Sequence, residues 1–144
     1  MTQPIILLAG AAGDLRIRVA KSLVSRGAAV RALVRSDASD ADKDRLATIG
    51  AKIVNADVND IGSVAATCAG ASCVVSALNG LHDVVVDRQG VLLDAAVKSG
   101  VPRFISSDYS LDFTKTTPGG NRLINEIGVG SSCPTRSFFI PSSH

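Results

Sequence analysis

Two closely spaced glycines, Gly10 and Gly13, follow a short apolar run and precede an amphipathic segment in the stretch LLAGAAGDLRIRVAKSLVSRG (7–27). Glycine permits a tight turn and lets backbone N–H groups approach a pyrophosphate, whose charge then faces the N-terminus of the following helix. An ordinary strand-to-helix turn is the alternative, because a G-x-x-G motif alone is short. The expected phosphate-binding residues are Gly10, Ala11, Ala12, Gly13, Asp14 and Leu15.

Arg16 occupies the position where a dinucleotide-binding loop would carry a third glycine. At about 100° per residue, it projects from the middle of the apolar face of the expected helix. We expect its stem to lie along apolar surface and its head to extend toward the mouth of the loop. There it could contact a cofactor phosphate, or it could push the helix away from the sheet. The residue pattern leaves both outcomes open.

Polar residues that follow the second and third apolar runs are candidates for binding an adenosine. Arg35, next to Ser36, ends the second run, where an arginine pairs with a 2′-phosphate and an acidic residue would instead bind a ribose 2′-hydroxyl. This arrangement favours NADP over NAD, although a solvated arginine is the alternative. Asp57, next to Val58, follows the third run and could accept a hydrogen bond from adenine. Capping of the next helix by Asp57 or Asn59 is equally compatible with the pattern.

Small residues end the fourth apolar run, in the stretch VVSALNG (74–80). Ser76, Ala77 and Leu78 would let a cofactor cross the end of the sheet. Close packing of the backbone is the alternative, because it also requires small side chains.

The elements that must position these residues alternate regularly over the first 108 residues. The expected strands are Ile5–Ala9, Ala29–Val34, Lys52–Ala56, Cys73–Ala77 and Arg103–Ser106. The expected helices are Asp14–Arg26, Asp40–Ile49, Ile61–Ala69 and Val84–Ser99, and a glycine follows each of them. This alternation predicts an α/β domain of the Rossmann-like type, with a doubly wound parallel sheet of about five strands in the order 3-2-1-4-5. We expect one dinucleotide-binding domain over residues 1–122 and an irregular tail over 123–144. In the tail, the apolar residues follow neither the spacing of a helix nor that of a strand.

Composition narrows the functional classes. The net charge is +2 with mixed signs, which does not predict a nucleic-acid surface. The three cysteines form no C-x-x-C pair, so reduced thiols and a cytoplasmic location are expected, and no metal-ligand spacing is present. Because no apolar run approaches the length of a membrane span and no signal peptide is visible, we expect no contact with a membrane.

The stretches LLAGAAGDL, NADVND, VVSALNG, GVLLDAAVKSGVPRFISSDYSLDF and PGGNR together resemble the NmrA-like family, an atypical branch of the short-chain dehydrogenases/reductases related to isoflavone and aromatic-alcohol reductases. The resemblance runs from about Ile5 to Arg122. It implies an NADP(H)-binding domain in which the glycine loop holds the pyrophosphate and Arg35 faces the 2′-phosphate. It also implies that Ser106, with Ser107 and Asp108, approaches the nicotinamide.

The catalytic residues are not identified by the sequence. Tyr109 is the only tyrosine, but Phe113 stands where a tyrosine–lysine pair would need its lysine, and Lys115 lies two positions further on. The neighbours His82 and Asp83 are a weak signal for a base.

The expected function is that of an NADP(H)-binding oxidoreductase for a small carbonyl or aromatic substrate. The family's C-terminal substrate-binding part is not found here, so we expect these 144 residues not to sustain turnover. A non-catalytic NAD(P)-sensing regulatory protein is the alternative. An unpaired fifth strand would favour a homodimer or other self-association, unless the tail covers that edge through Phe138 and Phe139.

Overall fold

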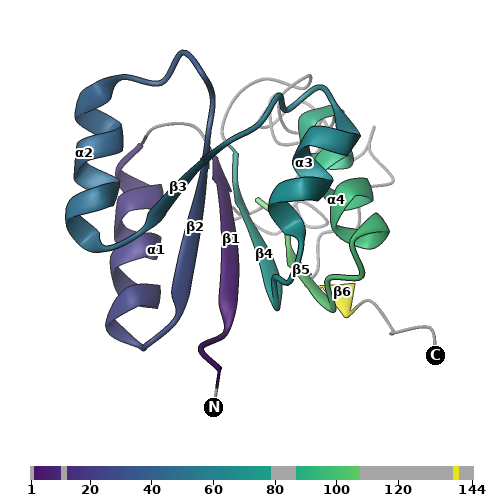
Figure 1. Cartoon of the computed structure of the whole chain (residues 1–144), viewed down its shortest axis with the longest axis horizontal. Coiled ribbons are helices and arrows are strands. Elements are labelled where there is room, and N and C mark those ends of the chain that lie inside the picture. The colour runs from purple at the N-terminus through teal and green to yellow at the C-terminus, as the bar shows by residue number, and fades with distance from the viewer. Residues whose placement is uncertain (1, 11–12, 79–86, 108–137, 140–144) are drawn as a thin grey trace, which may run out of the picture.

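The computed structural model describes residues 2–10, 13–78, 87–107 and 138–139, and it shows a sheet with helices on both faces (Figure 1). The elements in chain order are β1 (Ile5–Gly10), α1 (Asp14–Ser25), β2 (Ala29–Val34), α2 (Asp40–Ile49), β3 (Lys52–Asn55), α3 (Ile61–Cys68), β4 (Cys73–Ala77), α4 (Gln89–Lys98), β5 (Arg103–Ile105) and β6 (Phe138–Phe139). Most bounds agree with the expected ones to within one residue. Helix α4 begins at Gln89 rather than Val84, and residues 84–86 lie outside the described part.

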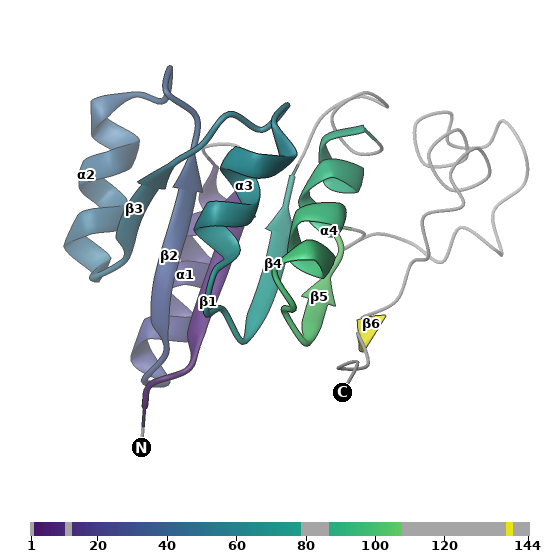
Figure 2. The same ribbon diagram turned by 45° about the vertical axis from the view of Figure 1, so that its right-hand side comes forward.

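The strands form one sheet in the order β3-β2-β1-β4-β5-β6, and β1 to β5 are parallel (Figure 2). The predicted order of these five strands is therefore confirmed. Strand β1 lies between β2 and β4, with Leu8 opposite Ala32 on one side and Val75 on the other. The order of the strands reverses at β1, which places the topological switch point between β1 and β4.

Successive residues of the central strand supply the two faces of the core. Leu7 and Leu8 are both fully buried, yet they belong to different clusters because side chains alternate across a strand. Leu7 packs in the cluster that contains Val64 of α3 and Leu92 of α4. Leu8 packs in the opposite cluster, which contains Ala20 of α1 and Leu46 of α2. Burial on both faces accounts for the near-continuous apolar strands that the sequence shows.

The C-terminal tail contributes a short strand that the sequence did not predict. Phe138 and Phe139 pair antiparallel with Phe104 and Arg103 of β5. Two residues are too few to produce a recognisable alternation, which explains why the pattern around them looks irregular. This pairing covers the β5 edge over those two positions, which is the alternative that the sequence offered to self-association through an open edge.

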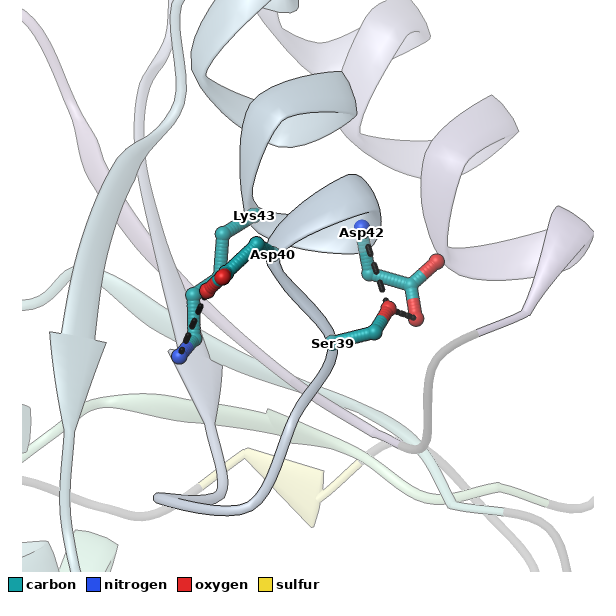
Figure 3. Close-up of polar contacts among 4 residues, drawn as sticks. All are labelled: Ser39, Asp40, Asp42 and Lys43. Carbon is teal, nitrogen blue, oxygen red and sulfur yellow. Dashed lines mark hydrogen bonds and ion pairs between the residues drawn. The ribbon is translucent and has the colours of Figure 1, made fainter.

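Helices α2 and α3 begin at side-chain caps. In α2 the Ser39 hydroxyl accepts a hydrogen bond from the Asp42 N–H (3.3 Å) and donates to the Asp42 carboxylate (2.8 Å), as Figure 3 shows. In α3 the Asp60 carboxylate accepts from the N–H groups of Gly62 (3.0 Å) and Ser63 (3.2 Å). Asp60 is therefore the cap, and neither Asp57 nor Asn59 is.

The predicted glycine ends of the helices are confirmed by their backbone angles. Gly50 has a φ of 95° and is the left-handed cap of α2, a conformation that residues with a Cβ rarely adopt. The glycines that follow the other helices also have positive φ, namely Gly27, Gly70 and Gly100.

Candidate functional site

The carboxyl ends of β1 and β4 lie side by side, with Ala9 opposite Ser76 and Gly10 opposite Ala77. In open parallel sheets, ligands bind beyond the carboxyl ends of the strands at such a switch point. The sequence candidates at the ends of these two strands are thus brought together in the fold. Ala11 and Ala12, which complete the glycine loop, lie outside the described residues.

Gly10 is needed for the approach of β1 to β4. A Cβ on Gly10 would lie 2.6 Å from the carbonyl oxygen of Ala77, which is shorter than any normal contact of such an atom. The sequence motif predicts that Gly10 permits a tight turn and the approach of backbone N–H groups to a pyrophosphate. The structure gives a further reason, which is contact between two strands at the edge where the candidate site lies.

The N-terminus of α1 is formed differently from those of α2 and α3. Gly13 is its N-cap, with an extended backbone (φ −170°, ψ 162°) and no side-chain cap. The first N–H groups of a helix have no partner within the helix, and its dipole places partial positive charge there. Asp14 and Leu15 are both exposed, and the Asp14 carboxylate accepts from Nε of Arg18 at 2.6 Å.

Arg16 is almost completely buried, with 2% of its surface exposed. Its Nη1 donates to the carbonyl oxygen of Gly10 at 2.8 Å, so the head of the side chain does extend back to the loop. It does not reach solvent, however, which corrects the expectation of a head extended toward the open mouth of the loop. Burial lowers the pKa of the Arg16 guanidinium, and the Asp42 carboxylate partly opposes this shift. Arginine nevertheless remains protonated in proteins, so a positive charge lies against the Gly10 carbonyl.

Arg35 lies directly after β2, as predicted, and its side chain is exposed. Its Nε forms an ion pair with the Asp37 carboxylate at 3.2 Å, with 53% and 69% of the two side chains exposed. The sequence-based interpretation of Arg35 did not consider Asp37, which stands only two positions further on. The missed signal is the triplet Arg35–Ser36–Asp37, in which the central Ser36 is also exposed.

Asp57 makes local contacts in the β3–α3 connection. Its Oδ1 accepts from the Asn59 N–H (2.9 Å), and its own N–H donates to the Ser63 hydroxyl (3.2 Å). Asp57 is exposed, while Val58 is half-buried against the cluster beneath α3 and α4. The Asp57 carboxylate therefore lies on the surface at the end of β3, with one oxygen engaged by the turn.

A set of hydrogen bonds joins the ends of β4 and β5 to the start of α4. The Ser107 hydroxyl donates to the Leu78 carbonyl (2.5 Å), and the Ser107 N–H donates to Oε1 of Gln89 (2.7 Å). Gln89 is only 4% exposed. Nothing in the sequence marks Gln89 as a site residue, because a glutamine near the start of a helix has no distinctive pattern.

The two serines at these strand ends are buried: Ser76 is fully buried, and 3% of the surface of Ser106 is exposed. Ala77 is 7% exposed, and Leu78 is half-buried. The burial of Ser76 and Ala77 shows that this part of the stretch is closely packed. The weak catalytic candidates His82, Asp83, Tyr109 and Lys115 lie outside the described residues.

Two other kinds of feature are absent from the part of the chain that the structure describes. It contains no group of three or more His, Cys, Asp or Glu side chains placed to hold a metal ion. In the same part, none of the helices combines the length and the apolar character needed to span a membrane. A surface groove of about 650 Å³ lies between α1 and α2, lined by residues such as Ile17, Lys21 and Arg45, away from the strand ends.

Solved structures share this fold. The chain matches AtPrR2 with NADP+ and (+)pinoresinol at a TM-score of 0.72 and 23% identity, over 90% of this chain and 46% of that one. It matches isoflavone reductase at 0.72 and 20% identity, over 89% and 44% of the two chains. It matches the leucoanthocyanidin reductase–NADPH complex from Vitis vinifera at 0.67 and 24% identity, over 79% and 39%. The chain therefore spans less than half the length of each of these three proteins.

A family model agrees with these likenesses. No curated protein sequence matches the chain. The model of the NmrA-like family, in contrast, matches residues 2–120, which include every described element from β1 to β5. On this match, the chain belongs to the NmrA-like family.

Proposed function

We propose that this chain is the NADP(H)-binding part of an oxidoreductase that acts on a small carbonyl or aromatic substrate. The observation that carries the proposal is the N-terminus of α1, which has no side-chain cap and follows a glycine loop at the switch point between β1 and β4. A pyrophosphate there would supply the acceptors that the first N–H groups lack. Structural neighbours described with NADP+ and with NADPH support the choice of cofactor.

The residues present fit such a cofactor. Gly13 is exposed and carries no side chain that could block the first turn of α1. Arg35 would hold the 2′-phosphate, and Asp57 would lie toward the adenine. The ends of β4 and β5, near Ala77 and Ser106, would lie toward the nicotinamide. When bound, the cofactor supplies the hydride, and the chain orients it.

Arg35 is free to change partners at little energetic cost. Its ion pair with Asp37 is exposed on both sides, and such pairs contribute about 0–1 kcal/mol. A 2′-phosphate carries more charge than a carboxylate and can accept two parallel hydrogen bonds from a guanidinium. We therefore expect a 2′-phosphate to displace Asp37 from Arg35, and NADPH to bind about tenfold more tightly than NADH, or more.

The test is a titration of the purified chain with NADPH and NADH at one ionic strength. Arg35→Ala should bring the two affinities close together by weakening NADPH alone. Asp37→Asn should strengthen NADPH, because it removes a competing negative charge. Arg26→Ala is the matched control, since Arg26 is also exposed but follows the other end of α1. Equal affinities in the parent chain would contradict the NADP preference, and no binding of either cofactor would contradict the proposed function.

Turnover is a separate question from binding. Positioning a substrate against the cofactor contributes about 7–11 kcal/mol to catalysis, and it needs groups on both sides of the nicotinamide. The described residues supply one side, at the ends of β4 and β5. Phe113 stands where a tyrosine–lysine pair with Tyr109 would need its lysine, so we expect these 144 residues to bind NADPH without oxidising it in the presence of aromatic aldehydes, ketones or enones. Turnover clearly above background would contradict this expectation. If a partner interaction changes with cofactor binding and turnover is absent, the non-catalytic sensor is favoured.

A further inference from the structure

Arg16 has an unusual environment for a charged side chain. Among the described residues it is the largest of the fully buried side chains, and it lies on the first turn of α1. Arginine is almost never buried to this degree unless it is paired. Among the residues that the structure describes, Arg16 has no carboxylate within ion-pair distance. The Asp42 carboxylate acts on it only through space and is itself engaged by Ser39.

Most of the hydrogen-bonding capacity of Arg16 is unused. Nη1 donates to the Gly10 carbonyl, whereas Nε and Nη2 are buried with no partner in the described part of the chain. An unsatisfied buried donor is costly, and an unneutralised buried charge is more so. The ligand-free fold therefore holds a charge whose natural complement is an anion.

The position of Arg16 indicates where that anion would lie. The hydrogen bond to Gly10 places the guanidinium against the first residue of the glycine loop. The last residue of the loop, Gly13, begins α1, whose N-terminal N–H groups have no side-chain cap. A helix N-terminus and a buried cation therefore contribute positive potential at the same end of β1.

We propose that Arg16 is the counter-charge of an anion site between Gly10 and the N-terminus of α1, where its charge stabilises a bound pyrophosphate or phosphate ester in place of a missing carboxylate. The inference rests on the proposed function, since both place an anion at the same loop, but it does not require the rest of a dinucleotide. It also selects between the two roles that the sequence left open for Arg16. The guanidinium assists binding rather than obstructing it.

Inorganic pyrophosphate is the probe, because it presents the anion without the nucleosides. Binding to the purified chain would be measured by titration calorimetry at constant ionic strength, with thermal unfolding as a second readout. We expect Arg16→Met and Arg16→Gln to weaken pyrophosphate binding at least tenfold. The glutamine variant keeps a donor for the Gly10 carbonyl, so it carries the test if the methionine variant does not fold. Arg16→Lys should bind pyrophosphate more tightly than Arg16→Gln, because a bound anion favours the charged form of a buried lysine.

Arg18→Met is the matched control. Arg18 lies on the same helix and its removal changes the net charge equally, but it is exposed and paired with Asp14. We expect its pyrophosphate affinity to stay within about threefold of the parent. Parent-like or tighter binding by Arg16→Gln would overturn the proposal, and so would a lysine variant as weak as the glutamine variant. Absence of pyrophosphate binding to the parent would overturn it as well.

The outcomes separate this inference from the proposed function. If the parent binds pyrophosphate through Arg16 but does not bind NADPH, the anion site stands and the proposed function fails. If NADPH binds equally to the parent and to Arg16→Gln, the proposed function stands and the role of Arg16 fails.

Discussion

Gly10 and Ala77 are so close that a Cβ on Gly10 would lie 2.6 Å from the Ala77 carbonyl oxygen and 2.8 Å from its carbonyl carbon. Both opposing atoms belong to the backbone of β4, so they cannot move aside by a change of rotamer. The two central strands therefore meet through glycine at the edge where the candidate site lies. The identity of residue 10 is set by packing between strands as well as by any ligand.

Gly10→Ala is expected to lower the free energy of unfolding by about 1–3 kcal/mol, because the added methyl group must separate β1 from β4. Urea denaturation would measure this change, and an NADPH titration should show weaker binding. Gly90→Ala is the control, since a Cβ on this helical glycine has nothing within 4 Å. Its stability should be unchanged or higher by up to about 1 kcal/mol. Equal destabilisation of both variants would contradict the close approach.

Arg31 joins β2 to the end of α3. Its Nη1 donates to the carbonyls of Thr67 (3.1 Å) and Ala69 (2.6 Å), which are among the carbonyls that a helix end leaves without partners. Arg31→Met should therefore cost about 1–3 kcal/mol in urea denaturation. Arg103→Met is the comparison, because Arg103 is an exposed arginine of another strand, and its replacement should change stability by no more than about 0.5 kcal/mol. A similar loss in both variants would show that the contact with α3 is not responsible.

Gln89 and Ser107 hold the ends of β4 and β5 at a fixed distance from α4. Gln89→Ala leaves the Ser107 N–H without its acceptor and should cost about 1–3 kcal/mol. Ser107→Ala keeps that N–H and loses only the bond to Leu78, so its cost should be smaller, about 0.5–1.5 kcal/mol. Urea denaturation would rank the two variants, and Ser25→Ala on the exposed end of α1 is a suitable control. A larger loss of stability in Ser107→Ala than in Gln89→Ala would contradict Gln89 as the main contact between α4 and the strand ends.

Cys68 and Cys73 are buried thiols that should react slowly. Burial raises the pKa of Cys68 to about 11 and raises that of Cys73 as well, since a thiolate is poorly solvated there. At pH 8.5, Cys68 should react with a thiol reagent on the order of 100-fold more slowly in the folded chain than in denaturant. The measurement uses Cys133→Ser, which leaves only these two thiols.

The sign of the pH effect follows from the same pKa. The folded state keeps the Cys68 thiol neutral where the unfolded state begins to ionise it. The contribution of Cys68 to the free energy of unfolding is therefore fully present below the ordinary thiol pKa. It is lost as pH rises toward about 11. Rapid labelling of the folded Cys133→Ser chain at pH 8.5 would contradict the burial of both thiols.

The fold was predictable because each of its signals is local. Alternating apolar segments and helix-ending glycines place β1 to β5 nearly residue by residue, and the parallel order follows from general rules of connection. Strand β6 was not predictable, because its pairing with Arg103 and Phe104 depends on a tertiary contact.

The candidate site was predictable in part. Periodicity gave the face from which Arg16 projects, but not its burial or its bond to Gly10, which depend on how closely α1 approaches the sheet. Likewise, the sequence could propose Asp57 or Asn59 as a cap but could not rank them against Asp60. All three lie within the same turn, and the backbone decides which side chain faces the N–H groups.

The pairing of β1 with β4 has a consequence for the order of folding. Strands β1 and β2 are joined by a single helix, whereas β1 and β4 are separated by two other strands and three helices. Contacts between distant segments require the closure of long loops and form more slowly than local ones. The glycine loop is therefore present in the chain early, but its neighbour at Ala77 arrives only with the fourth strand. During synthesis, a nascent chain that has not yet reached Cys73 would contain the loop without the strand beside it, and we expect it to have no affinity for the ligand.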